Sequence, residues 1–302
     1  MDFAVSYESS RALVRAEDRD RYLASLFAPA AKRHHLFALY AFHLEIVRIA
    51  VRVREPAMGE IRLQWWRDAI EGKAVGDAAG NPVAHALIDT IERCRLSRSL
   101  FLGMIDAHSF DLYSDPMESM HQLERYLDET SVALMRLALE ILDGSDSSIG
   151  ASFAGRAVGI AGLLRGFGPH AARGKVFVPP LDVLAHNSAD SASALSGEVT
   201  GNLIAALKEV QERARSDWML AEPWLARAES ALAALLPVAL VPAYLKAMER
   251  PGYDPFRTRI EIALVLERTS DGHQRLRKCI KINGVDISVM DLVGQLNVVL
   301  FL

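Results

Sequence analysis

The sequence predicts an all-α fold, with roughly nine or ten helices in a single domain. Apolar residues recur at helical spacing along most of the chain. Glycine- and proline-rich breaks separate these segments. No alternating β-branched run typical of a strand occurs before residue 280. A helical bundle of this size commonly builds its site at its centre, from side chains of facing helices.

Three helical segments are expected before residue 72. The first has an apolar stripe formed by Tyr22, Leu23, Leu26 and Phe27. The second has the stripe Leu36, Leu39, Tyr40, His43, Leu44 and Val47. The third carries Ile61, Trp65 and Ala69. Pro56 fits the first turn of this third helix, where its missing N–H costs nothing.

Later segments continue the pattern. One stripe consists of Leu123, Leu127, Leu134, Leu137 and Ile141. Residues 199–228 form a long amphipathic helix that we expect to begin near Ser196. The longest apolar run, residues 231–245, is interrupted by Pro237 and Pro242 and is shorter than the roughly 20 residues of a spanning helix. We interpret it as a buried or a membrane-touching helix pair, favour the buried arrangement, and expect no transmembrane span.

The end of the chain differs from the helical body. Residues 280–302 are rich in β-branched side chains and contain Asn283-Gly284, a turn signal. We therefore expect a helical domain over residues 1–279 and a distinct tail over 280–302. The sequence leaves open whether the tail is an appended hairpin, a frayed extension or an artefact.

Composition narrows the class of protein. The chain has 302 residues, 51% apolar and 24% charged, which is typical of soluble globular proteins. Its net charge of −4 argues against nucleic acid as a partner. Cys94 and Cys279 have no partner motif, and the first twenty residues lack the apolar core of a secretory signal. We expect a cytoplasmic location.

Three short motifs follow one another along the chain. Residues 37–42 contain Leu39-Tyr40-Ala41-Phe42 and run into residues 47–51. Gln122-Leu123-Glu124-Arg125-Tyr126 follows, and the third motif is Leu163-Leu164-Arg165 with residues 173–179 after it. From about residue 22 to about residue 255 the chain resembles the squalene/phytoene synthase family. This resemblance implies an isoprenoid (terpenoid) synthase-type helical bundle with a central cavity, in which two aspartate-rich motifs hold Mg²⁺.

The residues at the aspartate positions do not suit that chemistry. Mg²⁺ requires oxygen ligands and bridges carboxylates to phosphate oxygens. Aligned by frame, the six positions hold Val47, Arg48, Val51, Gly166, Pro169 and His170, none of which is a carboxylate. Arg48 puts a permanent cation where Mg²⁺ would bind. We expect metal-assisted diphosphate ionisation to be lost, and no metal site or cofactor; Mg²⁺ enters only if the chain is an active prenyltransferase.

These departures resemble the non-catalytic branch of the family. That branch includes the mitochondrial assembly factor of respiratory complex I (NADH:ubiquinone oxidoreductase) and its bacterial relatives. The matching segments include residues 41–45, 62–67, 128–131, 137–142 and 175–179. The resemblance implies a helper protein at the periphery of the inner membrane, with a membrane subunit of a respiratory complex as partner.

Two basic groups are candidates for a remnant diphosphate cavity that would bind a prenyl or lipid ligand. The first is Glu45, Arg48 and Arg52, which share one helix face. It is either a solvated Glu–Arg pair or a basic lining of the cavity. The second is Arg165, His170, Arg173 and Lys175. It either complements a helix C-terminus or binds an anion opposite the first group.

Other chemistry-bearing residues favour structural roles. Trp65 and Trp66 point about 100° apart, so we expect one in the core and one at a boundary, where it could contact a partner. The histidines, including His43 and His108, lack metal-ligand spacing with carboxylates. Asp106, Asp111 and Asp115 do not share a tight helix face, which argues against a salvage metal site.

Three functions remain open. The favoured one is a catalytically degenerate assembly or binding factor for a respiratory membrane complex, so we lean against an enzyme. The second is an active prenyltransferase of the squalene/phytoene type, which condenses prenyl diphosphates with arginine and lysine in place of metal clusters. The third is a scaffold whose cavity is filled by side chains.

Overall fold

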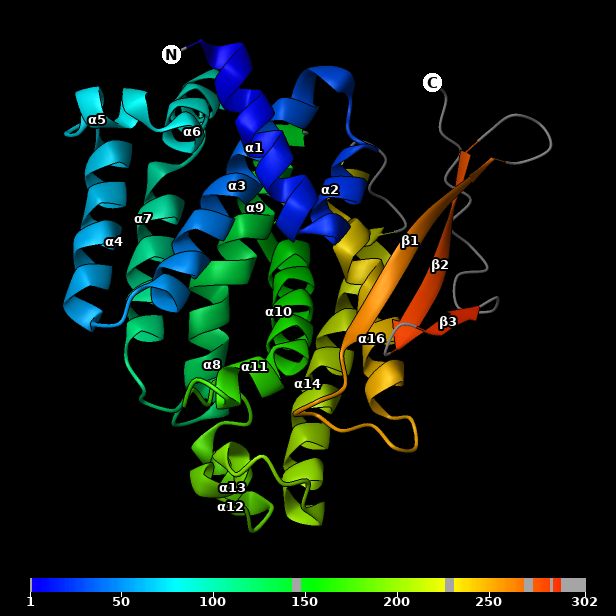
Figure 1. Ribbon diagram of the computed structural model, residues 1–302. Coiled ribbons are helices and arrows are strands. Elements are labelled where there is room, and N and C mark those ends of the chain that lie inside the picture. Colours follow the sequence, from blue (N-terminus) through cyan, green and yellow to red (C-terminus); the bar gives the residue numbers. More distant parts are fainter. Residues whose placement is uncertain (1, 143–147, 226–230, 269–273, 283–284, 289–302) are drawn as a thin grey trace. The chain divides into compact units, whose positions relative to one another are not determined.

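The computed structural model describes residues 2–142, 148–225, 231–268, 274–282 and 285–288 (Figure 1). The chain forms two compact units. Unit 1 comprises Met1–Asp115, Glu124–Arg156 and Ala228–Pro237. Unit 2 comprises Pro116–Leu123, Ala157–Arg227 and Val238–Leu302. Helices dominate both units up to residue 248, as the apolar periodicity predicts.

Unit 1 is helical throughout its described part. Its elements are α1 (Phe3–Glu17), α2 (Arg19–Ser25), α3 (Ala30–Arg52), α4 (Pro56–Glu71), α5 (Val75–Gly80), α6 (Pro82–Cys94), α7 (Arg98–Ala107), the 3₁₀ helix η1 (His108–Leu112), the π-helix η2 (Asp128–Val132), α9 (Ala133–Leu142) and α15 (Leu232–Leu235). Helices α8 (Met120–Leu127) and α10 (Ser148–Arg165) contribute residues to both units.

Helix α3 forms the core of unit 1. It packs against α1, α6 and α9, so neighbours cover several of its faces. All residues from Leu36 to Phe42 are at most 3% exposed, including residues outside the predicted stripe. A helix that is buried all round carries apolar residues on every face, which explains the unbroken run Leu36-Phe37-Ala38-Leu39-Tyr40-Ala41-Phe42.

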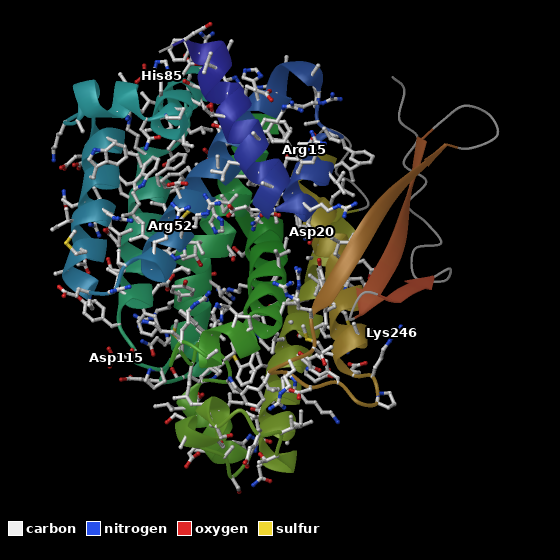
Figure 2. The ribbon with its side chains drawn as sticks, in the orientation of Figure 1. Arg15, Asp20, Arg52, His85, Asp115 and Lys246 are labelled. Atoms are coloured by element: carbon white, nitrogen blue, oxygen red, sulfur yellow. The ribbon has the colours of Figure 1, made fainter. Side chains whose placement is uncertain are left out.

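Helix α1 carries no apolar stripe in the sequence, because its buried face is largely polar. Ser6 and Ser10 are both fully buried. The Ser6 hydroxyl lies 2.9 Å from His85 Nδ1, and Ser10 donates to the Ser6 carbonyl oxygen at 3.0 Å. Figure 2 shows His85 near the N-terminal end of α1, where the ring of Phe3 stacks on it at 4.2 Å. Hydrogen bonds and small side chains hold this helix where a stripe of large apolar residues is absent.

Unit 2 contains the long amphipathic helix that the sequence predicts. Its helices are α11 (Phe167–Ala171), α12 (Leu181–His186), α13 (Ser191–Leu195), α14 (Gly201–Leu225) and α16 (Val241–Met248). The long helix α14 begins at Gly201 rather than near Ser196. Thr200 Oγ1 accepts a hydrogen bond from the Leu203 amide at 3.2 Å, so threonine caps this end.

The apolar run at residues 231–245 is buried, as expected. It forms α15, the 3₁₀ helix η3 (Leu236–Leu240) and the start of α16. Pro242 lies in the first turn of α16, where a proline is tolerated. None of the helices in the described part of the chain has the length and apolar character needed to cross a membrane.

An antiparallel sheet follows the helices, and here the expectation that no strand precedes residue 280 is wrong. The strands are β1 (Ile260–Arg268), β2 (Gln274–Ile282) and β3 (Val285–Ser288), in the order β1-β2-β3. The register pairs Ile260 with Ile282 and Ile282 with Val285. Short apolar runs do not distinguish strand from helix by periodicity alone, so β1 and its antiparallel partner β2, the next strand in the chain, had no clear strand signal. The turn signal at residues 283–284 lies outside the described residues, and the boundary at residue 280 stays a prediction.

Gly168 in α11 has no room for a side chain. An added Cβ would lie 2.3 Å from the Phe256 carbonyl oxygen and 2.9 Å from Phe256 Cα. Gly168→Ala is therefore expected to lower the free energy of unfolding by about 1–3 kcal/mol, because backbone atoms cannot swing aside. Denaturant unfolding followed by circular dichroism measures this change.

Gly162 provides the matched control for this substitution. It lies in the unit 2 part of α10, and apart from its chain neighbours and the backbone of its own helix, no atom of the described residues lies within 4 Å of its added Cβ. Gly162→Ala is expected to stabilise by about 0.4–1 kcal/mol through the lower entropy of the unfolded chain. Equal effects of the two substitutions would show that the contact with Phe256 does not constrain α11.

Candidate functional site

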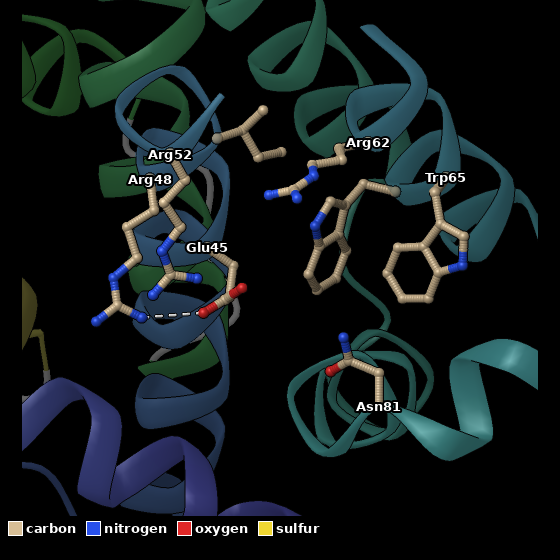
Figure 3. Close-up of a pocket in the computed structure, with 8 residues that line it drawn as sticks. Glu45, Arg48, Arg52, Arg62, Trp65 and Asn81 are labelled. Atoms are coloured by element: carbon tan, nitrogen blue, oxygen red, sulfur yellow. Dashed lines mark hydrogen bonds and ion pairs between the residues drawn. The ribbon is translucent and has the colours of Figure 1, made fainter. Parts of the chain in front are cut away.

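A pocket of about 160 Å³ lies between α3 and α4 of unit 1 (Figure 3). Its lining residues come from α3, from α4 and from the residue that precedes α6: Glu45, Arg48, Ile49, Arg52, Arg62, Trp65, Trp66 and Asn81. This single pocket contains all five residues that the sequence singled out on α3 and α4. The arrangement combines guanidinium groups with two indole rings.

The local sequence explains why the two helices meet here. Helix α3 ends at Arg52, and Pro56 in the first turn of α4 starts the next helix after only three residues. Such a short connection makes consecutive helices neighbours. Glu45, Arg48 and Arg52 lie at i, i+3 and i+7 and therefore share the face of α3 that borders the pocket.

The two tryptophans divide their roles as predicted. Trp66 is 4% exposed, and its ring lies 5.2 Å from the ring of Phe42 in an edge-to-face contact. Trp65 is half-buried and meets Trp66 edge-to-face at 5.1 Å. Trp66 thus anchors α4 to the core, while Trp65 lies at the boundary. A partner contact through Trp65 stays a prediction.

Arg48 is neutralised by carboxylates. Its Nη1 lies 3.0 Å from Glu45 Oε1, and its Nη2 pairs with Glu17 of α1. The side chain is only 15% exposed. Burial first, and the Arg52 cation second, lower the pKa of the Arg48 guanidinium from its usual value, although an arginine stays charged at neutral pH. The expected Glu–Arg pair forms, and the same residues line a pocket; a remnant diphosphate cavity here stays a prediction.

Arg52 and Arg62 supply the uncompensated positive charge. Both side chains are exposed, and neither forms an ion pair with any other described residue. Figure 3 shows Arg62 reaching from α4 toward α3. Asn81 adds a further donor. Its Oδ1 accepts hydrogen bonds from the amides of Val83 and Ala84 at 3.0 and 3.2 Å, so its side-chain NH₂ group is the part that can donate to a ligand. Donors of this kind suit an anion.

Sequence reasoning missed Arg62 and Asn81 as pocket residues. Arg62 lies one helical turn before Trp65 and Trp66, which is the signal that could have placed it beside them. Asn81-Pro82 is a helix-start signal, with an N-cap residue followed by proline in the first turn. Asn81 lines the pocket because the start of α6 packs against α4, and this contact between separate helices cannot be read from either segment alone.

The second predicted group lies in unit 2. Arg165 Cζ is 3.9 Å from the centre of the Tyr244 ring, a cation–π contact. The His170 ring meets Phe177 edge-to-face at 4.9 Å. Arg173 and Lys175 follow α11, where the Lys175 amide donates to the His170 carbonyl oxygen at 3.0 Å. The first group belongs to unit 1, so their predicted positions on opposite sides of one cavity stay a prediction.

A buried polar cluster in unit 1 was interpreted from sequence only as scattered histidines and aspartates. His108 Nδ1 lies 2.7 Å from Asp111 Oδ2, and Tyr126 donates to Asp111 Oδ1 at 2.9 Å. The His43 ring lies 6.0 Å from His108. Burial, then the nearby Asp111, raises the pKa of Tyr126 well above its usual range. Burial, then Arg21 and His108, lowers the pKa of His43 well below its usual value.

Two of the three carboxylates considered for a salvage metal site have separate partners. Asp106 Oδ1 lies 2.6 Å from Arg67 Nε, and Asp111 is bonded to His108 and Tyr126. Within the described residues, no three His, Cys, Asp or Glu side chains gather in an arrangement that could hold a metal ion.

The chain is similar in sequence to one protein family and to several proteins of known name. The family model described as squalene/phytoene synthase matches residues 14–266. The chain is 29% identical over 252 residues to the Rattus norvegicus protein named NADH dehydrogenase (ubiquinone) complex I, assembly factor 6, covering 82% of this chain and 75% of that protein. The protein of the same name from Homo sapiens is 33% identical over 169 residues, covering 55% and 51%. A phytoene synthase from Arthrospira platensis is 27% identical over 278 residues, covering 84% and 87%.

Solved structures share the fold. A squalene synthase, HpnC, from Alicyclobacillus acidocaldarius superposes with a TM-score of 0.71 at 22% identity, covering 84% of this chain and 97% of that one. A dehydrosqualene synthase solved with a ligand gives a TM-score of 0.69 at 17% identity, covering 81% and 88%. The predicted all-α, isoprenoid synthase-type fold class is confirmed.

Proposed function

The chain belongs to the squalene/phytoene synthase family, and from that premise we propose that it is a non-catalytic assembly factor for a respiratory complex of the complex I type. Its curated relatives named complex I assembly factor 6 support this role. A membrane subunit of such a complex is the proposed partner, and the inner-membrane periphery is the proposed location.

The observation that carries the proposal is the state of Arg48. In the family frame this position belongs to the first aspartate-rich motif, whose carboxylates bridge Mg²⁺ to a diphosphate. Here a guanidinium is fixed by Glu45 and Glu17 and is largely buried. Its permanent charge disfavours a divalent cation nearby. An anionic ligand without metal, such as a prenyl or lipid phosphate, suits the exposed Arg52 and Arg62 better.

An active prenyltransferase is the alternative. The phytoene synthase from Arthrospira platensis supports it, because that match spans most of both chains. In this alternative Mg²⁺ would be the cofactor, and Arg48 and Arg165 would contact diphosphate.

We expect no diphosphate release when the purified protein is incubated with farnesyl or geranylgeranyl diphosphate and Mg²⁺. Two features supply the physical reason: no carboxylate occupies the frame positions, and Arg48 is already paired. A coupled assay of released diphosphate makes the measurement, with a metal-dependent synthase of the family as the positive control. Turnover that is abolished by Arg48→Ala or Arg165→Ala would establish the prenyltransferase instead.

The assembly role has its own experiment. The tagged protein is captured from detergent-solubilised membranes, and co-purifying proteins are identified by mass spectrometry. Enrichment of respiratory-complex subunits over a mock capture supports the proposed role, and the absence of any such subunit contradicts it. Because this measurement does not depend on turnover, it separates a missing partner from a missing activity.

A further inference from the structure

An uncovered apolar stripe runs along α4 beside the pocket. Met58 and Ile61 are 49% and 63% exposed, and the half-buried Trp65 continues the line. Positions i, i+3 and i+7 lie on one side of a helix. The opposite side, with Leu63 and Trp66, is buried in the core. Helix α4 therefore has two apolar faces, and within the described residues only one of them is covered.

Hydrogen-bond donors border this stripe directly. Arg62 and Trp65 line the pocket and lie within one turn of Ile61, so the apolar stripe and the basic pocket are continuous. Arg52 and Asn81 add donors from the other walls. The carboxylate among the lining residues is Glu45, which Arg48 holds at 3.0 Å.

The acidic side chain in the first half of α4 is turned elsewhere. Tyr113 donates a hydrogen bond of 3.4 Å to Glu60 Oε1, on a side of the helix away from Met58 and Trp65. The corner where α3 meets α4 thus offers uncompensated cations next to apolar side chains. A partner that is complementary to this corner must carry negative charge directly beside an apolar region.

A phospholipid surface has this layered chemistry, with phosphates above acyl chains. Tryptophan favours the boundary between the two layers because its ring is apolar and its N–H is polar. We propose that unit 1 docks on an anionic phospholipid membrane through the α3–α4 corner, defined by Arg52, Met58, Ile61, Arg62, Trp65 and Asn81. Lipid phosphates occupy the donor-lined pocket, and the stripe on α4 enters the acyl boundary. This inference rests on the proposed peripheral membrane role and names the surface that performs it.

Co-sedimentation with vesicles tests the proposal on the full chain. Wild-type protein is expected to bind vesicles of phosphatidylcholine with phosphatidylglycerol at least tenfold more tightly than vesicles of phosphatidylcholine alone. Salt is expected to weaken this binding, because screening reduces the attraction to surface charge. Each basic side chain near an anionic membrane contributes about fivefold in affinity.

Two double variants probe the two parts of the corner. Arg52→Glu with Arg62→Glu is expected to reduce binding to the anionic vesicles at least tenfold, and Met58→Asp with Ile61→Asp by a similar factor. The matched control is Met219→Asp with Leu220→Asp on α14, which replaces side chains of similar exposure, 53% and 49%, with the same charges. This control is expected to bind as wild type does. Circular dichroism and thermal melting confirm that each variant is folded.

Several outcomes overturn the proposal. The first is wild-type protein that binds anionic vesicles no more tightly than vesicles of phosphatidylcholine alone. The second is corner variants that bind anionic vesicles as tightly as wild type does. The third is a control variant whose affinity for anionic vesicles falls as much as that of the corner variants. Tight binding of inorganic phosphate that vesicles do not compete for would assign the pocket to a soluble anion instead. A protein that binds vesicles but also releases diphosphate would keep the docking surface and contradict the non-catalytic role, so the two failures are distinguishable.

Discussion

Phe42→Ala is expected to lower the free energy of unfolding by about 3–5 kcal/mol. Phe42 is completely buried, and its ring meets Trp66 at 5.2 Å and Phe101 at 5.4 Å, both edge-to-face. These contacts join α3 to α4 and α7. Truncation removes the transfer free energy of the ring and leaves a cavity that the surrounding helices close only in part. Urea unfolding monitored by circular dichroism, with the midpoint and slope fitted together, measures the loss.

Phe3→Ala makes the same chemical change at an exposed site. Phe3 is 42% exposed and stacks on His85 at 4.2 Å. Its truncation is expected to cost less than about 1 kcal/mol, because little apolar surface returns to water. If the two substitutions cost the same, the junction of α3, α4 and α7 would not be the core of unit 1. The comparison bears on the pocket as well, since the contact of Phe42 with Trp66 fixes the helix that carries Arg62 and Trp65.

The parts of the fold that could be predicted from sequence are those with large apolar side chains at regular spacing. The central part of α3 is an example. The spacing of Leu36, Leu39 and Tyr40 predicts a helix with these side chains buried, and the structure buries the residues between them as well. The division between buried Trp66 and boundary Trp65 followed from the 100° step between adjacent helical residues. The i, i+3, i+7 spacing placed Glu45, Arg48 and Arg52 on one helix face, where the structure has them.

What the sequence did not predict depends on contacts between distant segments. Helix α1 is held by Ser6 and Ser10, whose small polar side chains give no periodic apolar signal. The pocket is completed by Arg62 and Asn81, which come together only when α4 meets the start of α6. The cluster of His108, Asp111 and Tyr126 unites η1 with α8, and spacing in the chain does not reveal it.

Acidification from about pH 6.5 to pH 4 is expected to destabilise the protein through two buried histidines. Burial first, and the neighbouring His34 second, lower the pKa of His35 to about 4. His35 is 6% exposed, and its Nδ1 lies 2.9 Å from Thr90 Oγ1. Burial, then Arg21 and His108, lower the pKa of His43 well below its usual value.

The direction of the effect follows from where the protons bind. In the unfolded chain both imidazoles have a pKa of about 6.5, so they take up protons as the pH falls below that value. The folded protein resists the same protonation until the pH approaches the lowered pKa values. The unfolded state therefore binds more protons in this window, and stability falls by about 1.4 kcal/mol per pH unit for each histidine. For His35 the total loss is about 2–3 kcal/mol by pH 4, and above pH 6.5 neither group contributes.

Chemical denaturation at a series of pH values isolates the histidine contribution. Between pH 6.5 and 5 most carboxylates remain ionised, so the slope of stability against pH in that interval reports mainly imidazoles. His35→Gln and His43→Gln are each expected to flatten the slope, because each removes a buried imidazole whose pKa is lowered in the folded protein. A slope in the wild type that matches those of both buried-site variants would mean that His35 and His43 gain their protons in the folded state. In that case the burial of these two imidazoles would not be the source of the loss of stability in acid.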